Sequence, residues 1–296
     1  MGGLDLNREP SDAGTIDGGG DPRIDSTRPL QIGLYVHVPF CVSKCDYCDF
    51  FSVAGLHSTV YDRVIAGTLG ELEEALVALG DPIVGSLYVG GGTPSALGDD
   101  RLARFVRLLI ARITRPRGQP IEVTVEANPR HLSSALLQAL WQAGVNRLSV
   151  GVQSFDSRLR SVIGRRGPDD FSTRLGVLRE WPGRLSFDLI QCIPGQDAGS
   201  AVADVEAALN SAPVDHLSVY SLSVDPDTPL ARRLRMTEPS SEVAADIAQA
   251  TTAALESYDF HQYEVSNFSR PGFESAHNLG YWFGRPYLGI GPGAVS

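Results

Sequence analysis

Residues 35–50 read Tyr35-Val-His-Val-Pro-Phe-Cys-Val-Ser-Lys-Cys-Asp-Tyr-Cys-Asp-Phe50. Three cysteines, Cys41, Cys45 and Cys48, follow one another here at the spacing Cys-x3-Cys-x2-Cys. Three thiolates on one short loop can hold three irons of a 4Fe–4S cube and leave the fourth iron without a protein ligand. An open metal position is where a substrate or cofactor binds, as in catalytic zinc sites. The stretch therefore predicts a 4Fe–4S cluster that takes part in chemistry.

Zinc and disulfide interpretations of these cysteines are weaker. A zinc site normally needs four ligands, as two Cys-x2-Cys pairs or a mixed Cys/His set. The only other cysteine is Cys192, so the sequence has no second pair. A disulfide framework is disfavoured because the chain has 296 residues, 4 cysteines and no recognisable secretory signal. Cys192 follows an apolar run and is interpreted as a small buried hydrophobe.

Composition excludes some classes of protein. The hydrophobic content of 43% supports a sizeable core, and the net charge of −10 argues against general nucleic-acid binding, which needs a basic face. No stretch approaches the roughly 18 uninterrupted apolar residues of a transmembrane segment. A cluster with an open iron also needs a reducing compartment, so we expect the cytoplasm.

We expect three regions along the chain. Residues 1–28 are rich in Gly, Asp and Pro, lack an apolar period and predict a disordered leader. Frequent acidic residues there argue against a targeting peptide. Residues 29–230 are predicted to form the domain that carries the cluster. Residues 231–296 are predicted to form a helix and a C-terminal extension.

Short apolar runs alternate with amphipathic segments after the leader. The predicted strands are Ile32–Val38, Ser86–Gly90, Ile121–Glu126, Arg147–Val152, Leu185–Ile190 and Val214–Tyr220. The predicted helices are Ser58–Leu79, Asp100–Ile113, Ser133–Ala143, Asp169–Glu180 and Ala201–Leu209. Buried, unalternating strands between helices are typical of a parallel sheet. The pattern predicts an α/β fold, an open partial (β/α)6 barrel of the TIM type, with its site at the carboxyl ends of the strands.

The cysteine spacing, with the aromatic Tyr47 just before the last cysteine, resembles the radical S-adenosylmethionine (SAM) superfamily. The flanking run Tyr35-Val-His-Val-Pro-Phe40 narrows the resemblance to the oxygen-independent coproporphyrinogen III oxidase family, from about residue 31 to residue 296. In that superfamily the amino and carboxylate groups of SAM bind the fourth iron, and an electron from the cluster cleaves SAM. The resemblance implies SAM as a second cofactor and a reductant protein as a partner.

Polar and glycine residues lie where the predicted strands end. The run Gly90-Gly-Gly-Thr-Pro-Ser95 lets backbone approach a ligand closely, and in the family this loop binds the SAM amino group. An unpaired carboxylate at Glu126 would be costly, so it either pairs with Arg130 or Arg147 or binds the ribose or amine of a ligand. The resemblance implies the following SAM-binding residues: Tyr35, Tyr47, Gly91, Gly92, Thr93, Glu126, Gln153, Arg165 and Asp188.

Two features separate the branches of the family. Oxidases acting on coproporphyrinogen carry a fourth cysteine two residues after the third, where this chain has Phe50. The word His277-Asn-Leu-Gly-Tyr-Trp282 resembles the haem-binding motif of the haem chaperone branch. From the residues alone, the alternative is that these aromatics cover an open barrel edge while the histidine binds a loop. The resemblance implies haem as a third cofactor, held by His277, Asn278, Tyr281 and Trp282.

The sequence thus favours a haem chaperone that carries a 4Fe–4S cluster and SAM and transfers haem to an acceptor protein, such as a respiratory haem enzyme. No residue is assigned a catalytic role. One alternative is an oxygen-independent coproporphyrinogen III oxidase, which decarboxylates propionates through a 5′-deoxyadenosyl radical. Another is a catalytically silent, truncated homologue, because family members usually continue past this point into a smaller helical domain.

Overall fold

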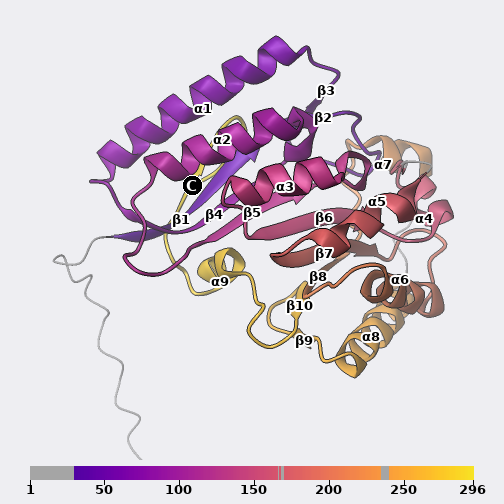
Figure 1. Cartoon of the computed structure of the whole chain (residues 1–296). Coiled ribbons are helices and arrows are strands. Elements are labelled where there is room, and N and C mark those ends of the chain that lie inside the picture. The colour runs from indigo at the N-terminus through magenta and orange to yellow at the C-terminus, as the bar shows by residue number, and fades with distance from the viewer. Residues whose placement is uncertain (1–29, 166, 168–169, 235–239) are drawn as a thin grey trace, which may run out of the picture. The chain divides into compact units, whose positions relative to one another are not determined.

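A mainly parallel open sheet organises the chain (Figure 1). The computed structural model describes residues 30–165, 167, 170–234 and 240–296, and residues 31–296 form one unit. The leader predicted at residues 1–28 lies outside the described residues. The strand order in the described sheet is β11-β1-β4-β5-β6-β7-β8-β10-β9.

Six neighbouring strands are parallel and follow the order of the sequence. They are β1 (Gln31–Val38), β4 (Ile83–Gly91), β5 (Glu122–Ala127), β6 (Arg147–Gln153), β7 (Arg184–Gln191) and β8 (His216–Ser221). Each overlaps one of the six predicted strands, so the predicted α/β order is confirmed. In parallel sheets the carboxyl ends of neighbouring strands meet at one edge, which places the loops after these strands together.

Helices connect these strands. They are α1 (Ser58–Ala78), α2 (Asp99–Arg112), α3 (Ser134–Gln142), α4 (Ser157–Val162), α5 (Phe171–Gly176) and α6 (Ala198–Ser211), with short 3-10 turns η1 (Pro94–Leu97), η2 (Pro129–His131) and η3 (Val177–Glu180). The helix predicted over Asp169–Glu180 is divided into α5 and η3, and its first residue lies outside the described ones. The sequence pattern did not predict α4, which has only 6 residues.

The strands alternate in polarity, contrary to the unalternating pattern we expected. On β4, Val84, Leu87 and Val89 are fully buried in the main core. Ser86 and Tyr88 instead hydrogen-bond groups of other elements, His277 and Glu126. Successive strand side chains point to opposite faces, so one face is apolar and the other carries polar groups. The polar face is where a site can form.

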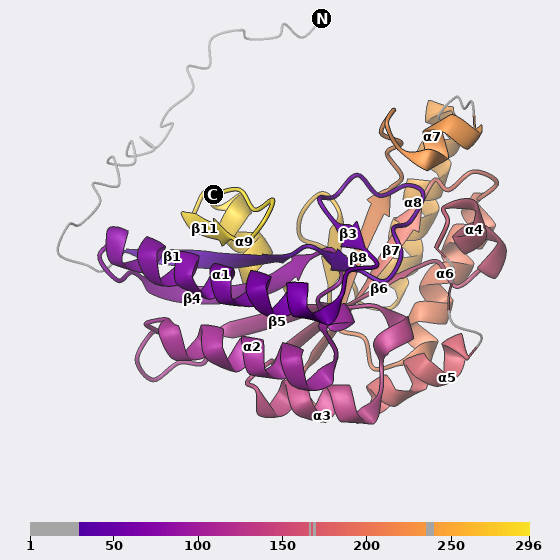
Figure 2. The same cartoon turned by 90° about the horizontal axis from the view of Figure 1, so that it is seen from above.

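The C-terminal region extends the sheet at both edges. Strand β11 (Tyr287–Ile290) pairs in parallel with β1, while β10 (Asn267–Ser269) and β9 (His261–Gln262) add antiparallel strands beyond β8. The remaining helices are α7 (Pro229–Leu234), α8 (Ser241–Ser257) and α9 (Ala276–Trp282). Helix α9 lies on the opposite side of β1 and β4 from α2 and α3 (Figure 2). No helix in the described ranges has the length and hydropathy needed to span a membrane.

Candidate functional site

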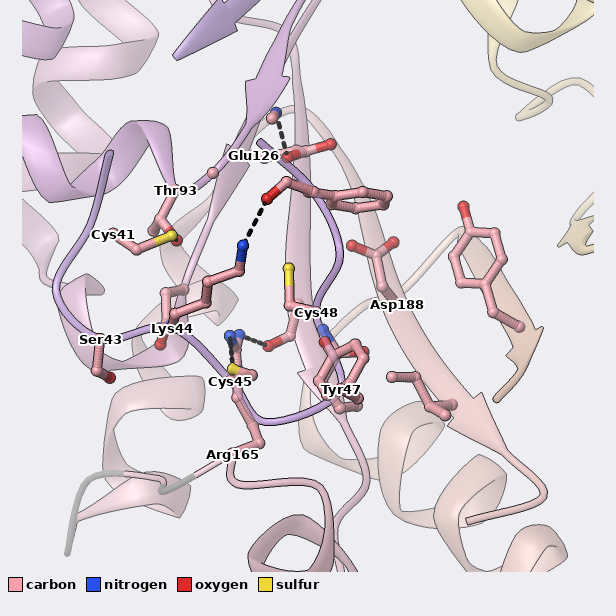
Figure 3. Close-up of a pocket in the computed structure, with 18 of the residues that line it drawn as sticks. Cys41, Ser43, Lys44, Cys45, Tyr47, Cys48, Thr93, Glu126, Arg165 and Asp188 are labelled. Atoms are coloured by element: carbon pink, nitrogen blue, oxygen red, sulfur yellow. Dashed lines mark hydrogen bonds between the residues drawn. The ribbon is translucent and has the colours of Figure 1, made fainter. Parts of the chain in front are cut away.

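A cavity of about 370 Å³ opens between the cysteine loop and the carboxyl ends of β4 to β8. Figure 3 shows Cys41, Cys45, Cys48, Glu126 and Asp188 around it. Of the residues predicted for the cluster and SAM, those lining the cavity are Cys41, Cys45, Tyr47, Cys48, Gly91, Gly92, Thr93, Glu126, Gln153, Arg165 and Asp188. The structure therefore brings together side chains that are up to 147 positions apart in the sequence (188 − 41).

The cysteine loop is held in place by hydrogen bonds to its backbone. It lies between the short parallel strands β2 (Phe40–Cys41) and β3 (Val53–Ala54). Within the loop, Lys44 Nζ donates to the Phe50 carbonyl over 3.0 Å. From outside the loop, His37 Nε2 donates to the Phe51 carbonyl over 2.8 Å. These contacts hold the backbone of the loop against β1 and β2 from both inside and outside the loop.

The donor set of the loop fits an iron–sulfur cluster. All three thiols are free and half-buried, and Arg165 Nη1 lies 3.6 Å from the sulfur of Cys45. Burial raises the pKa of the Cys48 thiol, so a metal is needed to hold it as thiolate. No three His, Cys, Asp or Glu side chains in the described part of the chain converge as ligands of a single ion. In a 4Fe–4S cube each of three thiolates takes a different iron, and the loop supplies three cysteines for it.

The glycine run packs too tightly to accept side chains. A Cβ at Gly90 would lie 2.7 Å from Oε1 of Glu126, and one at Gly92 would lie 2.8 Å from the carbonyl oxygen of Phe40. Gly91 has a φ of +109°, and a Cβ there would lie 2.6 Å from the His37 ring. Only glycine has neither the steric clash nor the conformational penalty at these positions. The run therefore lets the end of β4 pack closely against its neighbours, and the backbone of Gly91 and Gly92 faces the cavity.

Two partly buried carboxylates face the cavity without an ion pair to any described residue. Glu126 accepts hydrogen bonds from the hydroxyl of Tyr88 at 2.8 Å and from the backbone N–H of Gly91 at 3.2 Å. Burial, followed by the nearby charge of Asp188, raises the pKa of Glu126 to about 7. Asp188 accepts from Ser149 Oγ at 3.0 Å, and burial raises its pKa too. Such carboxylates can accept from a cationic or hydroxyl-bearing ligand.

Two neighbouring strands have a residue with a left-handed backbone conformation at or just after their last position. Gln153, the last residue of β6, has a φ of +73°, and Cys192, which follows β7, has a φ of +62°. Residues other than glycine seldom adopt this left-handed conformation, and such strain often accompanies functional sites. Cys192 is buried, as predicted, and does not line the cavity. The sequence carried no signal for this strain, because it depends on tertiary packing.

Tyr35 lies near the cavity without lining it. Its hydroxyl is 3.0 Å from Nδ1 of His37, whose other nitrogen holds the cysteine loop. Because His37 Nε2 donates to a carbonyl, its Nδ1 accepts from Tyr35. Tyr88 also lines the cavity and was not among the residues predicted from the sequence. Its position two residues before Gly90, on the polar face of β4, was the feature of the sequence that could have identified it as a cavity residue.

The predicted haem residues lie on α9, which does not contribute to the cavity. His277 is buried, and its ring nitrogens are joined by hydrogen bonds to Ser86 Oγ at 2.9 Å and Tyr281 Oη at 3.1 Å. Burial lowers the pKa of His277 to about 4, so its imidazole is neutral. The side chain of Trp282 is 57% exposed and free to take a partner. Asn278 donates its backbone N–H to Ser275 Oγ in the first turn.

Comparisons with known proteins identify the class. The family model of the radical SAM superfamily matches residues 35–208. Heme chaperone HemW of Bacillus subtilis is 37% identical over 88% of this chain and 69% of its own length. Heme chaperone HemW of Mycobacterium tuberculosis is 38% identical over 88% of this chain and 68% of its own length. The structure of coproporphyrinogen III oxidase (HemN) from Escherichia coli, a radical SAM enzyme, superposes with a TM-score of 0.76 at 25% identity.

This chain therefore belongs to the radical SAM superfamily, and its fold is the partial barrel that the HemN structure also has. Within the HemN-like family it is a HemW-like protein. The superposition covers 90% of this chain and 64% of the HemN chain, so the solved relative is considerably longer. Membership of the superfamily implies a 4Fe–4S cluster and SAM as cofactors.

Proposed function

We propose that this protein is a haem chaperone that binds a 4Fe–4S cluster, SAM and haem and transfers haem to an acceptor protein. The observation that carries the proposal is the similarity to two HemW haem chaperones over 88% of the chain. The position of Phe50 supports it, because the oxidases of the family carry a cysteine there. The haem acceptor would be a protein such as a respiratory haem enzyme. A reductant protein would supply electrons to the cluster. The reaction partners would meet in a reducing, cytoplasmic compartment.

The residues of the cavity would bind the two cofactors implied by the family. Cys41, Cys45 and Cys48 would hold the cluster, which supplies one electron at a time when it is bound. Glu126 and Asp188 would accept hydrogen bonds from SAM, and each accepts more strongly when it is ionised. Phe50, two residues after the last cysteine of the loop, also lines the cavity and is exposed.

Helix α9 is the proposed haem-binding element. Because both ring nitrogens of His277 have partners, iron can bind this imidazole only after the bonds to Ser86 or Tyr281 are released. Trp282 is exposed and could stack on a porphyrin face without rearrangement. Haem binding by His277 should consequently be slow relative to haem contact with Trp282.

Haem titration of the anaerobically reconstituted protein tests this function. A Soret shift is expected on binding, and His277→Ala should remove the iron ligand and change the shift. Trp282→Ala should weaken haem binding by about 1–3 kcal/mol through lost stacking and burial. Matched controls are His261→Ala and Trp141→Ala, since both residues are exposed and lie on other elements. Equal haem affinity in Trp282→Ala and Trp141→Ala would contradict the proposed site.

A second candidate function is favoured by the superposition on HemN at a TM-score of 0.76. A coproporphyrinogen III oxidase would decarboxylate its substrate under reducing, anaerobic conditions in the presence of SAM. We expect no decarboxylation by this protein. Robust decarboxylation, together with haem binding that does not depend on His277, would establish the oxidase instead.

A further inference from the structure

Tyr88 is in contact with two groups that have separate proposed roles. Its hydroxyl donates to Oε1 of Glu126 over 2.8 Å, on the cavity side. Its ring stacks on the imidazole of His277, with a centroid distance of 5.2 Å and an interplanar angle of 29°. Tyr88 is therefore the side chain that touches both the carboxylate of the cavity and the histidine of α9.

The contact with His277 is fixed by the way α9 is anchored. Glu122 accepts hydrogen bonds from the hydroxyl of Ser275 and from the backbone N–H groups of Ala276 and His277, at 3.0–3.1 Å. A carboxylate at this position satisfies the free N–H groups of the first helical turn. Room for the imidazole comes from Gly33, where a Cβ would lie 3.3 Å from Cε1 of His277. These contacts fix the position of the His277 ring against which the ring of Tyr88 packs.

The contact with Glu126 is equally close. A Cβ at Gly90 would lie 2.8 Å from Cε1 of Tyr88 and 2.7 Å from Oε1 of Glu126, so the strand leaves the two side chains little freedom. One carboxylate oxygen accepts from Tyr88 and the other from the N–H of Gly91. These two donors set the plane of the carboxylate and therefore the direction of its remaining lone pairs.

Several charged or titratable groups act on Glu126 from the surrounding strands. Asp188 on β7 raises its pKa, while the hydroxyl of Tyr88, the N–H of Gly91 and the charge of Arg147 on β6 lower it. Tyr35 on β1 and Tyr220 on β8 also lie within electrostatic range, and burial raises the pKa of each tyrosine, so both stay neutral. Removal of the Tyr88 hydroxyl alone should therefore move the pKa of Glu126 further upward.

We infer that Tyr88 is a positioning residue that orients the Glu126 carboxylate for SAM and links this carboxylate to His277 on α9. It acts through Glu126. The inference rests on the SAM site of the proposed function and does not require haem transfer. Its consequence is that a change in the packing of α9 alters SAM affinity from outside the cavity. By linkage, SAM would alter any ligand equilibrium of α9 by the same factor.

The test compares the SAM affinity of full-length variants that carry a reconstituted cluster. Binding is measured from the change in the electron paramagnetic resonance signal of the reduced cluster as SAM is added. Tyr88→Phe keeps the ring on His277 and removes the bond to Glu126. We expect SAM to bind roughly tenfold more weakly, in line with the loss of a hydrogen bond to a charged group. The control is Ser186→Ala, which removes a buried hydroxyl bonded to His216 over 2.7 Å and leaves Glu126 untouched. Its SAM affinity should be that of wild type.

The pH profile gives a readout that general loss of structure would not move. SAM affinity of the wild type should rise with pH as Glu126 ionises, around pH 7. In Tyr88→Phe the midpoint should lie at higher pH, because a donor that favours the ionised carboxylate is gone. An unmoved midpoint with an affinity within twofold of wild type would overturn the inference.

A double-mutant cycle tests the link to α9. His277→Gln removes the stacked ring and should weaken SAM binding by a smaller factor than Tyr88→Phe does. The two changes should be non-additive, because both act through the same carboxylate. If Tyr88→Phe fails to hold its cluster, His277→Gln alone decides, and an unaltered SAM affinity overturns the link. Absence of SAM binding by wild type would instead remove the SAM site itself, which distinguishes failure of the proposed function from failure of the inference.

Discussion

The guanidinium of Arg165 donates a hydrogen bond to the sulfur of Cys45 over 3.6 Å and a second one to the carbonyl of Gly151 over 2.6 Å. One cation thereby joins the cysteine loop to the end of β6. The nearby thiols and Tyr47 hold the pKa of Arg165 above its ordinary value despite burial, so its charge is permanent. A fixed positive charge beside a predicted cluster ligand is a means of tuning the cluster.

Arg165→Met should lower the reduction potential of the cluster. The positive charge and the hydrogen bond to Cys45 both stabilise the reduced, more negative cluster, and the variant lacks both. Iron content should stay near that of wild type, because the three thiols remain. Redox titration of the reconstituted proteins measures the potential. Arg158→Met on α4 is a suitable control, since this arginine is exposed and pairs only with Asp156 among the described residues. A potential that is equal in the two variants would contradict the expected role.

The three cysteines of the loop should each be required for the cluster. Anaerobic reconstitution should give about four irons and four sulfides per chain. Cys41→Ala, Cys45→Ala and Cys48→Ala should each lose the cluster, and Cys192→Ala should retain it because Cys192 is buried elsewhere. Iron and sulfide analysis with visible absorption provides the measurement. Full retention of the cluster in any of the first three variants would refute the assignment.

Much of the fold could be predicted because long elements carry a clear pattern. The six neighbouring parallel strands have enough residues for their apolar pattern to be recognised, and so do helices such as α1. These strands are β1, β4, β5, β6, β7 and β8. Strands β9 and β10 have 2 and 3 residues, and β11 has 4, so no period can be recognised in them. Their place in the sheet follows from tertiary packing at its two edges. Short strands of this kind can be recognised only in a structure.

The candidate site was predictable to the extent that it depends on strand ends. Motif spacing and position were enough to bring Cys41, Glu126 and Asp188 to one edge of the sheet. The surroundings of His277 were not predictable, because its hydrogen-bond partner Ser86 is 191 positions away. The same holds for Tyr88, whose role depends on contacts with two distant elements. Whether the α9 residues hold haem stays a prediction.

Glu126→Gln should weaken SAM binding and raise the free energy of unfolding at high pH. The pKa of Glu126 in the folded protein is raised from 4.5 to about 7. The folded state thus binds this proton more tightly than the unfolded state, and the free energy of unfolding falls as pH rises from about 4.5 to about 7. At pH 8 the variant should be more stable than wild type by about 2 kcal/mol, less than full burial would give because Glu126 lines an open cavity.

Urea denaturation of the cluster-free protein at pH 5 and pH 8 measures this difference. Glu74→Gln is the control, because Glu74 is exposed on α1 and should show no such change between the two pH values. SAM binding by Glu126→Gln should be weaker than that of wild type above pH 7 and should lose its rise near pH 7. If the stability of Glu126→Gln and wild type changes in parallel with pH, the carboxylate does not titrate as described.

His277 should make the fold sensitive to acid. Burial lowers its pKa from 6.5 to about 4, with Arg147 acting in the same direction and Glu122 against it. Its neutral form therefore stabilises the fold above pH 6.5, and this stability is lost as pH falls toward 4, because the unfolded state takes up the proton first. At pH 7, His277→Gln should lower the free energy of unfolding by about 2 kcal/mol through lost hydrogen bonds and packing. The difference in free energy of unfolding between variant and wild type should narrow steadily between pH 6.5 and pH 4, as followed by denaturation at several pH values.

His261→Gln should show neither effect, since His261 is exposed on β9. A gap of constant size across this range would show that His277 is not held neutral inside the fold.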